Sequence, residues 1–159
     1  NLTFGNFLAF VSGSATFNMS RGGNNTLVAR NYAATSTGSI AYTGGSGEDN
    51  LTFGNGLAYE GTATFDLGSD PAVDTVTFEG IVAASGGNVS ISNFDPTDGD
   101  TIVLQIFSNT ADVTLSPSGG SSDTQVSGSG VQFVISGVTT GSLGLTTNTD
   151  GYVVITDVI

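Results

Sequence analysis

The sequence predicts an all-β protein built as a β-solenoid, and three observations support that fold class. Short runs rich in Val, Ile, Thr and Phe alternate with breaks rich in Gly, Ser, Asn and Asp, and Gly accounts for 24 of the 159 residues. A long internal repeat contains a finer repeat of about 25 residues. An Asp or Asn recurs at one position of the finer repeat. Together these features predict strands that stack coil upon coil.

The long repeat is visible directly in the sequence. Residues 1–6 and residues 50–55 both have the sequence Asn-Leu-Thr-Phe-Gly-Asn, and the similarity continues to Phe17 in the first copy and Phe65 in the second. The length suits one domain. We therefore expect a single β domain over residues 1–159, made of degenerate repeats at 1–49, 50–99 and 100–159.

Each unit of the finer repeat carries two predicted strands. One strand series begins at Asn25, Asp49, Asp74, Asp100, Asp123 and Asp150, and the other covers residues 15–19, 39–42, 63–67, 89–92 and 112–115. Within residues 74–78, Val76 and Phe78 share one face of the strand. Such a unit cannot bury its apolar face alone, whereas stacking about six of them produces a continuous core. The regularly recurring aromatic residues are expected in that core.

An antiparallel β-sandwich or jelly roll is the alternative, because it has a similar spacing of strands and turns. The recurring Asp favours the solenoid, since stacking places equivalent residues above one another. If the solenoid is correct, Asp49, Asp74 and Asp100 lie on successive turns. Three core residues should then stack beside them: Leu51, Val76 and Ile102.

The stacked aspartates suggest a metal site. Carboxylates about 4.8 Å apart repel one another by roughly 3 kcal/mol at an effective dielectric constant of 20. Such a column needs solvent, protons or a cation, and Ca²⁺ is bound by carboxylate and main-chain carbonyl oxygens of the kind that Gly-rich turns expose. The alternative is that the aspartates only form turns. The candidate Ca²⁺ ligands are Asp49, Asp66, Asp70, Asp74, Asp95, Asp98 and Asp100.

A family resemblance points in the same direction. Residues 44–52, Gly-Gly-Ser-Gly-Glu-Asp-Asn-Leu-Thr, fit the nonapeptide G-G-x-G-x-D-x-U-x. Residues 74–78, 91–95 and 98–103 are similar to the β-rich segments that flank such repeats. Over residues 44–104 the chain thus resembles the secreted calcium-binding repeat proteins of the RTX (haemolysin-type) family. The resemblance implies secretion and calcium affinity. It does not imply the family's β-roll geometry, because there is one full nonapeptide and the coil is longer.

Composition excludes several function classes. The chain has 2 basic and 14 acidic residues and a net charge of −12, which opposes binding to nucleic acids and anionic membranes. It contains no His and no Cys, so zinc sites, thiol chemistry and the usual catalytic triads are absent. No apolar run is long enough to span a membrane. The two cations, Arg21 and Arg30, lie far from the acidic clusters, and we expect no enzymatic activity; a polysaccharide-acting enzyme is the third alternative.

The two ends suggest self-assembly. The sequence starts inside a repeat unit and finishes on an apolar β segment, without a recognisable capping segment. Uncapped solenoids pair with further chains, so the chain either is part of a longer array, or stacks end on end with its copies, or donates a terminal strand to the next subunit. We expect an extracellular or cell-surface structural protein whose partners are copies of itself in a filament, surface layer or matrix. The final segment is apolar on both faces, so either its own chain or a neighbour should bury it. The residues expected at a subunit boundary are Tyr152, Val153, Val154, Ile155, Val158 and Ile159.

A calcium-binding adhesion or carbohydrate-binding module of a larger secreted protein is the alternative function. Its partner would be a cell-surface glycan. Exposed aromatic rings would bind the sugar, and the candidates are Tyr32, Tyr42 and Tyr59.

Overall fold

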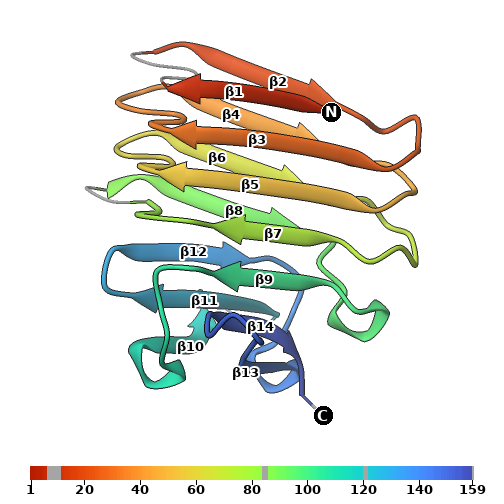
Figure 1. The fold of residues 1–159 in the computed structure, drawn as a ribbon, viewed down its shortest axis with the longest axis vertical. Coiled ribbons are helices and arrows are strands. Elements are labelled where there is room, and N and C mark those ends of the chain that lie inside the picture. The colour runs from red at the N-terminus through yellow and green to blue at the C-terminus, as the bar shows by residue number, and fades with distance from the viewer. Residues whose placement is uncertain (7–11, 84–85, 120–121, 159) are drawn as a thin grey trace.

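Two seven-stranded sheets face each other in the computed structural model, which describes residues 1–6, 12–83, 86–119 and 122–158 (Figure 1). The first sheet has the order β1 (Leu2–Asn6), β3 (Asn25–Asn31), β5 (Asp49–Asn55), β7 (Thr75–Phe78), β9 (Thr101–Leu104), β14 (Val153–Asp157) and β13 (Leu143–Thr147). The second has the order β10 (Val113–Ser118), β11 (Asp123–Gly128), β12 (Val131–Ile135), β8 (Asn88–Ser92), β6 (Thr62–Asp66), β4 (Ser39–Thr43) and β2 (Ser14–Asn18). The described residues also form the short 3₁₀ helices η2 (Pro96–Asp98), η3 (Thr110–Asp112) and η4 (Thr140–Ser142).

The chain alternates between the sheets and forms a solenoid of about four turns. Strands β1, β3, β5, β7 and β9 pair in parallel, as do β2, β4, β6, β8 and β12. The predicted core stack is present, because Leu51 pairs with Val76 and Val76 with Ile102. The solenoid prediction is therefore confirmed.

The predicted number of about six coils is too high, because parallel pairing in the first sheet ends at β9, near Leu104. The segments that begin at Asp123 and Asp150 keep the sequence spacing, but β11 and β14 are antiparallel to their neighbours. Only two residues, Ser129 and Gly130, join β11 to β12, and so short a connection permits only an antiparallel hairpin. The second sheet therefore continues with β12, and the predicted strand at 112–115 belongs to the antiparallel β10.

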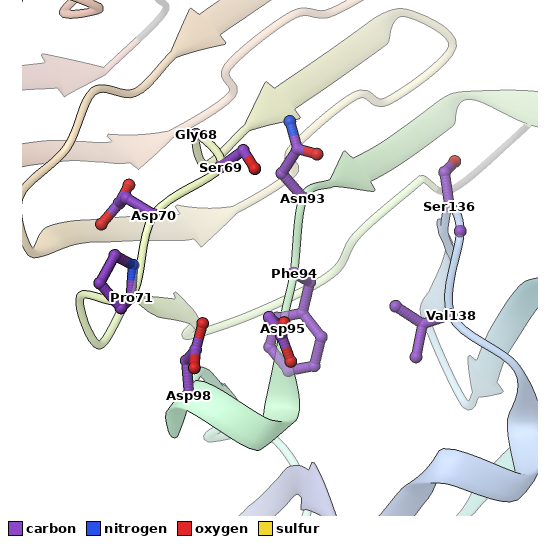
Figure 2. A pocket seen from close by; sticks show the side chains of 11 residues that line it. Gly68, Ser69, Asp70, Pro71, Asn93, Phe94, Asp95, Asp98, Ser136 and Val138 are labelled. Carbon is purple, nitrogen blue, oxygen red and sulfur yellow. The ribbon is translucent and has the colours of Figure 1, made fainter.

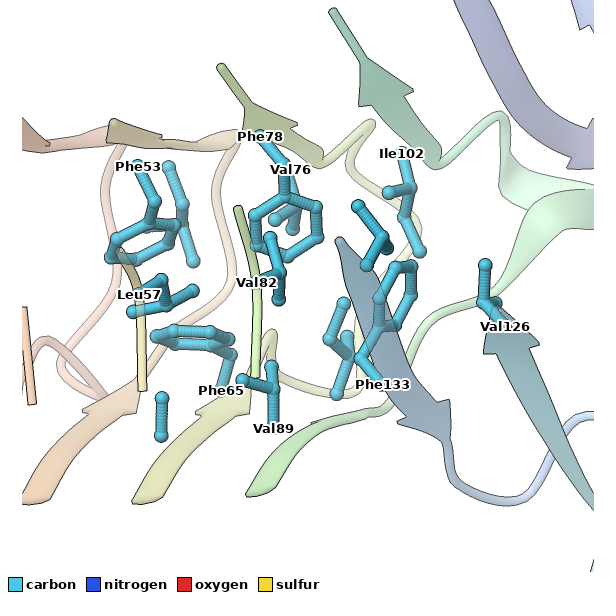
Figure 3. Close-up of a cluster of buried hydrophobic side chains, with 14 of the residues drawn as sticks. Phe53, Leu57, Phe65, Val76, Phe78, Val82, Val89, Ile102, Val126 and Phe133 are labelled. Atoms are coloured by element: carbon cyan, nitrogen blue, oxygen red, sulfur yellow. The ribbon is translucent and has the colours of Figure 1, made fainter. Parts of the chain in front are cut away.

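Aromatic and aliphatic side chains from both sheets fill the space between them (Figure 3). The Phe53 and Phe65 rings stack across the sheets with centroids 4.5 Å apart, and those of Phe78 and Phe133 lie 5.1 Å apart. All four rings are fully buried. The prediction that recurring aromatics form the core holds for these residues.

Close approach between coils makes Gly54 a sensitive position. A Cβ added there would collide with the main-chain carbonyl of Arg30 on the preceding coil, and a backbone atom cannot move aside as a flexible side chain can. We expect Gly54→Ala to lower the free energy of unfolding by about 1–3 kcal/mol or more. Gly141→Ala is the matched control, since nothing lies within 4 Å of its Cβ position. Urea denaturation measures both; equal stabilities would contradict this packing of the coils.

Candidate functional site

Three buried aspartates connect successive coils of the first sheet. Asp49, Asp74 and Asp100 are 0%, 3% and 2% exposed. Oδ1 of Asp74 accepts a hydrogen bond from the Asp49 N–H at 2.8 Å, and Oδ1 of Asp100 accepts one from the Asp74 N–H at 2.8 Å. Asn25 Nδ2 donates to Asp49 Oδ1 at 2.7 Å. We call this run of Asn25, Asp49, Asp74 and Asp100 the carboxylate ladder.

Burial changes the protonation of the ladder. Burial raises the pKa of Asp74 to about 7. The hydrogen bond from the Asp49 N–H lowers this pKa, whereas the charges of Asp100, Asp49 and Asp70 raise it further. Burial also raises the pKa of Asp100, where the charges of Asp95 and Asp98 add to the effect and N–H donors from Asp74 and Asp95 oppose it. The ladder therefore retains protons at pH values at which an exposed aspartate is ionised.

Three buried oxygen atoms near the ladder have no hydrogen-bond partner among the described residues: Tyr42 Oη, Asp49 Oδ2 and Asp70 Oδ2. Burial and the negative charge of Asp49 raise the pKa of Tyr42. A Cβ at Gly44 would collide with Asp49 Oδ2 and with the carbonyl oxygen of Leu67. Asp49 Oδ2 therefore lies beside the glycine turn that starts the predicted nonapeptide, whereas Asp70 Oδ2 lies beside Gly68.

A pocket of about 450 Å³ holds three further candidate ligands. Asp70 lies on the loop after β6, whereas Asp95 and Asp98 lie on the loop after β8 (Figure 2). Oδ1 of Asp70 accepts from the Ala72 N–H at 2.9 Å. Oδ1 of Asp95 accepts from the Thr97 N–H at 2.9 Å and caps η2. Asp70 and Asp95 thus have the turn role that was the alternative to metal binding.

Asp66, the remaining candidate ligand, lies outside this pocket. Its Oδ1 accepts from the Gly68 N–H at 3.2 Å and from Asn93 Nδ2 at 2.6 Å. Over the described ranges, no three acidic side chains gather closely enough to bind a metal by themselves. A cation here would need main-chain carbonyl oxygens as well.

The C-terminal segment is covered by its own chain. Strand β14 lies between β9 and β13 and pairs with both, and Val153, Val154 and Ile155 are buried. Tyr152 is partly buried and Val158 is 52% exposed, while Ile159 lies outside the described residues. Of the two alternatives for this segment, burial within its own chain is the one observed, so it does not present a free edge.

The N-terminal coil has the opposite character. β1 and β2 are the edge strands of the two sheets, at the end of the solenoid where the ribbon is red in Figure 1. Five of their inward-facing and neighbouring apolar side chains contact the core but are only partly buried: Leu2, Phe4, Ala15, Phe17 and Met19. At the other end, the edge strand β10 contains Pro117, which discourages further pairing.

The three tyrosines proposed for sugar binding have different environments. Tyr42 is 2% exposed, so it belongs to the core and the prediction of an exposed ring is wrong for it. It alternates with Ala41 in β4 and therefore faces inward together with Ile40. Tyr32 and Tyr59 are 43% and 42% exposed, and a glycan partner for them stays a prediction.

Comparison of the chain with protein-family models, curated proteins and solved structures finds no match. Within the part of the chain that the structure describes, no helix is both long and apolar enough to cross a membrane.

The ladder predicts an unusual dependence of stability on pH. The pKa of Asp74 in the folded chain, about 7, lies above the ordinary value of 3.8, so the folded state binds the proton more tightly than the unfolded state. This contribution is complete below about pH 4 and is lost as the pH rises through 7. The free energy of unfolding should therefore fall by up to about 1.4 kcal/mol per pH unit for each retained proton.

Asp74→Asn should remove most of that slope, because an amide oxygen can accept the Asp49 N–H without ionising. Asp112→Asn is the control, since Asp112 is exposed. Thermal melts from pH 4 to pH 8 measure both variants. A wild-type melting temperature that rises over this interval would contradict a protonated ladder.

Proposed function

We propose that this chain is a non-enzymatic extracellular structural protein that associates with copies of itself through its N-terminal coil, β1 and β2. The observation that carries the proposal is that, among the described residues, β1 and β2 each leave one strand edge beside a layer of partly buried apolar side chains. The edge strands at the other end are β13 and β10, and Pro117 in β10 discourages pairing there. Unpaired edges and exposed apolar side chains both favour pairing with another chain.

Charge favours contact between two N-terminal ends. All 14 acidic residues lie in residues 48–159, whereas residues 1–47 carry only the cations Arg21 and Arg30. Two copies therefore meet with the least repulsion when their N-terminal coils approach. This contact is isologous and closes a pair of chains, so a filament, surface layer or matrix requires a second contact on the sides of the solenoid.

A buried charge at the open edge tests this contact. Ala15 faces inward on β2 but is only partly buried, so Lys can reach solvent in a free chain, whereas a paired chain would bury its charge. We expect the wild type to form a pair in sedimentation equilibrium and Ala15→Lys to remain a monomer with unchanged circular dichroism. Thr114→Lys, on the exposed face of β10, should still pair. A wild-type chain that is monomeric up to its solubility limit would contradict the proposal.

Calcium binding is the second candidate, and the unpartnered buried oxygens of Tyr42, Asp49 and Asp70 favour it. Asp49 Oδ2 lies beside the Leu67 carbonyl, and a Cβ at Gly68 would meet Asp70 Oδ2 at 3.1 Å and collide with the Gly45 carbonyl. These carboxylate and carbonyl oxygens match the chemistry that Ca²⁺ prefers. A bound ion would also relieve the burial of unpaired carboxylate oxygens.

Chelation distinguishes a bound ion from bare turn residues. If Ca²⁺ is bound, EDTA should lower the melting temperature, because an ion at 100 times its Kd stabilises the fold by about 2.7 kcal/mol. Asp70→Asn should abolish the response to EDTA, while Asp112→Asn should leave it intact. Identical wild-type melts with Ca²⁺ and with EDTA would leave these aspartates as turn and ladder residues.

A further inference from the structure

The outer face of the first sheet carries two regular rows of short side chains. On its parallel strands, alternate residues point away from the core, and the register aligns them from coil to coil. The central row consists of Thr3, Val28, Thr52, Thr77 and Val103. The row beside it consists of Thr26, Asn50, Thr75 and Thr101. We call these two rows the threonine array.

The threonine array is rigid and periodic. Its side chains are about 4.8 Å apart between strands and about 6.7 Å apart along a strand. The Oγ1 atoms of Thr75 and Thr101 lie 3.3 Å apart. All members except Asn50 are β-branched, which restricts χ1, and most are partly buried by their neighbours. The array ends at β9, because Val154 on the adjacent β14 is only 7% exposed.

Charge is excluded from the array although the chain has a net charge of −12. The nearest ionised side chains on these strands, Arg30 on β3 and Glu79 after β7, follow the central row at the ends of the strands. The corresponding rows of the second sheet are also uncharged but contain fewer threonines: Thr16, Ala41, Thr64 and Ser90 in one row, and Ser14, Ser39, Thr62 and Asn88 in the other. The two rows thus present an uncharged surface made mainly of methyl and hydroxyl groups, and the exposed Arg30 and Glu79 border it.

We propose that the threonine array binds ice. Methyl groups cannot hydrogen-bond, so water beside them bonds to other water molecules, while hydroxyls can donate to and accept from that water. Because the groups are fixed on a two-dimensional grid, they hold the water between them in a repeating arrangement. Ice consists of regularly placed water molecules, so it can match such a surface along all of its coils at once.

Other partners fit the array less well. A flat sugar polymer is bound by aromatic rings, and neither row contains one; anionic polymers are repelled by the net charge. A second copy of the chain could lie face to face on the array, and that arrangement is treated as an outcome of the test. Apart from Thr3, no residue of the threonine array lies on β1 or β2, the strands through which two copies are proposed to pair. The two proposals can therefore fail separately.

Thermal hysteresis, which is the gap between the melting and freezing temperatures of a small ice crystal, tests the proposal. The wild-type chain should show hysteresis that grows with protein concentration. Thr52→Lys and Thr77→Lys place a strongly hydrated charge in the middle of the array and should reduce hysteresis to that of buffer. Thr64→Lys is the matched control, because Thr64 points outward from β6 in the second sheet, and it should keep the wild-type hysteresis.

The three Lys variants must keep the circular dichroism spectrum and melting temperature of the wild type. If a Lys variant does not fold, Thr52→Ser and Thr77→Ser replace it. These variants keep the hydroxyl and remove the methyl group, and they should lose part of the hysteresis. Wild-type hysteresis equal to that of buffer would overturn the proposal. So would an equal loss in Thr64→Lys. Wild-type oligomers that Thr52→Lys dissociates, without hysteresis, would assign the array to contact between copies.

Discussion

The parallel part of this fold depends on the hydrogen bond that the main-chain N–H of one coil donates to a buried aspartate of the next coil. Asp74 and Asp100 each make it at 2.8 Å, at the point where a strand of the first sheet begins. A hydrogen bond of this kind contributes about 0.5–1.5 kcal/mol, and leaving a buried donor or acceptor unpaired costs about 1–3 kcal/mol. The contact therefore holds each coil in one register, and that register also stacks Leu51, Val76 and Ile102.

The ladder also explains where the solenoid changes character. Asn25 replaces Asp at its first position and donates to Asp49 Oδ1, so the ladder starts without adding a charge near the N-terminal coil. At its other end, the second oxygen of Asp100 accepts from the Asp95 N–H at 2.8 Å, within its own loop. Beyond that strand the sheets continue with antiparallel pairs, and β13 and β10 become the edge strands at that end.

The strands and their stacking could be predicted from the sequence. Stacked coils place an Asp at the same position of successive repeats, and strands such as 74–78 alternate between core-facing and outward-facing residues. The sequence was insufficient for the coil count, since Asp123 and Asp150 keep the spacing while the short Ser129–Gly130 connection imposes a hairpin. The buried position of Tyr42 could have been found from its alternation with Ala41. The backbone conformation at the turns between the sheets could not have been predicted. Ala58 and Ala83 have φ of 50° and 52°, and an alanine in the sequence does not indicate that conformation.

The carboxyl carbon shifts of the aspartates, followed by NMR across a pH titration, measure the ladder most directly. The burial described above predicts that Asp74 titrates with a pKa of about 7 and that Asp100 also titrates above the ordinary range of an aspartate. If the carboxyl groups of Asp74 and Asp100 both titrate near pH 4, these aspartates are not buried between coils, and the ladder is not what holds the solenoid in register.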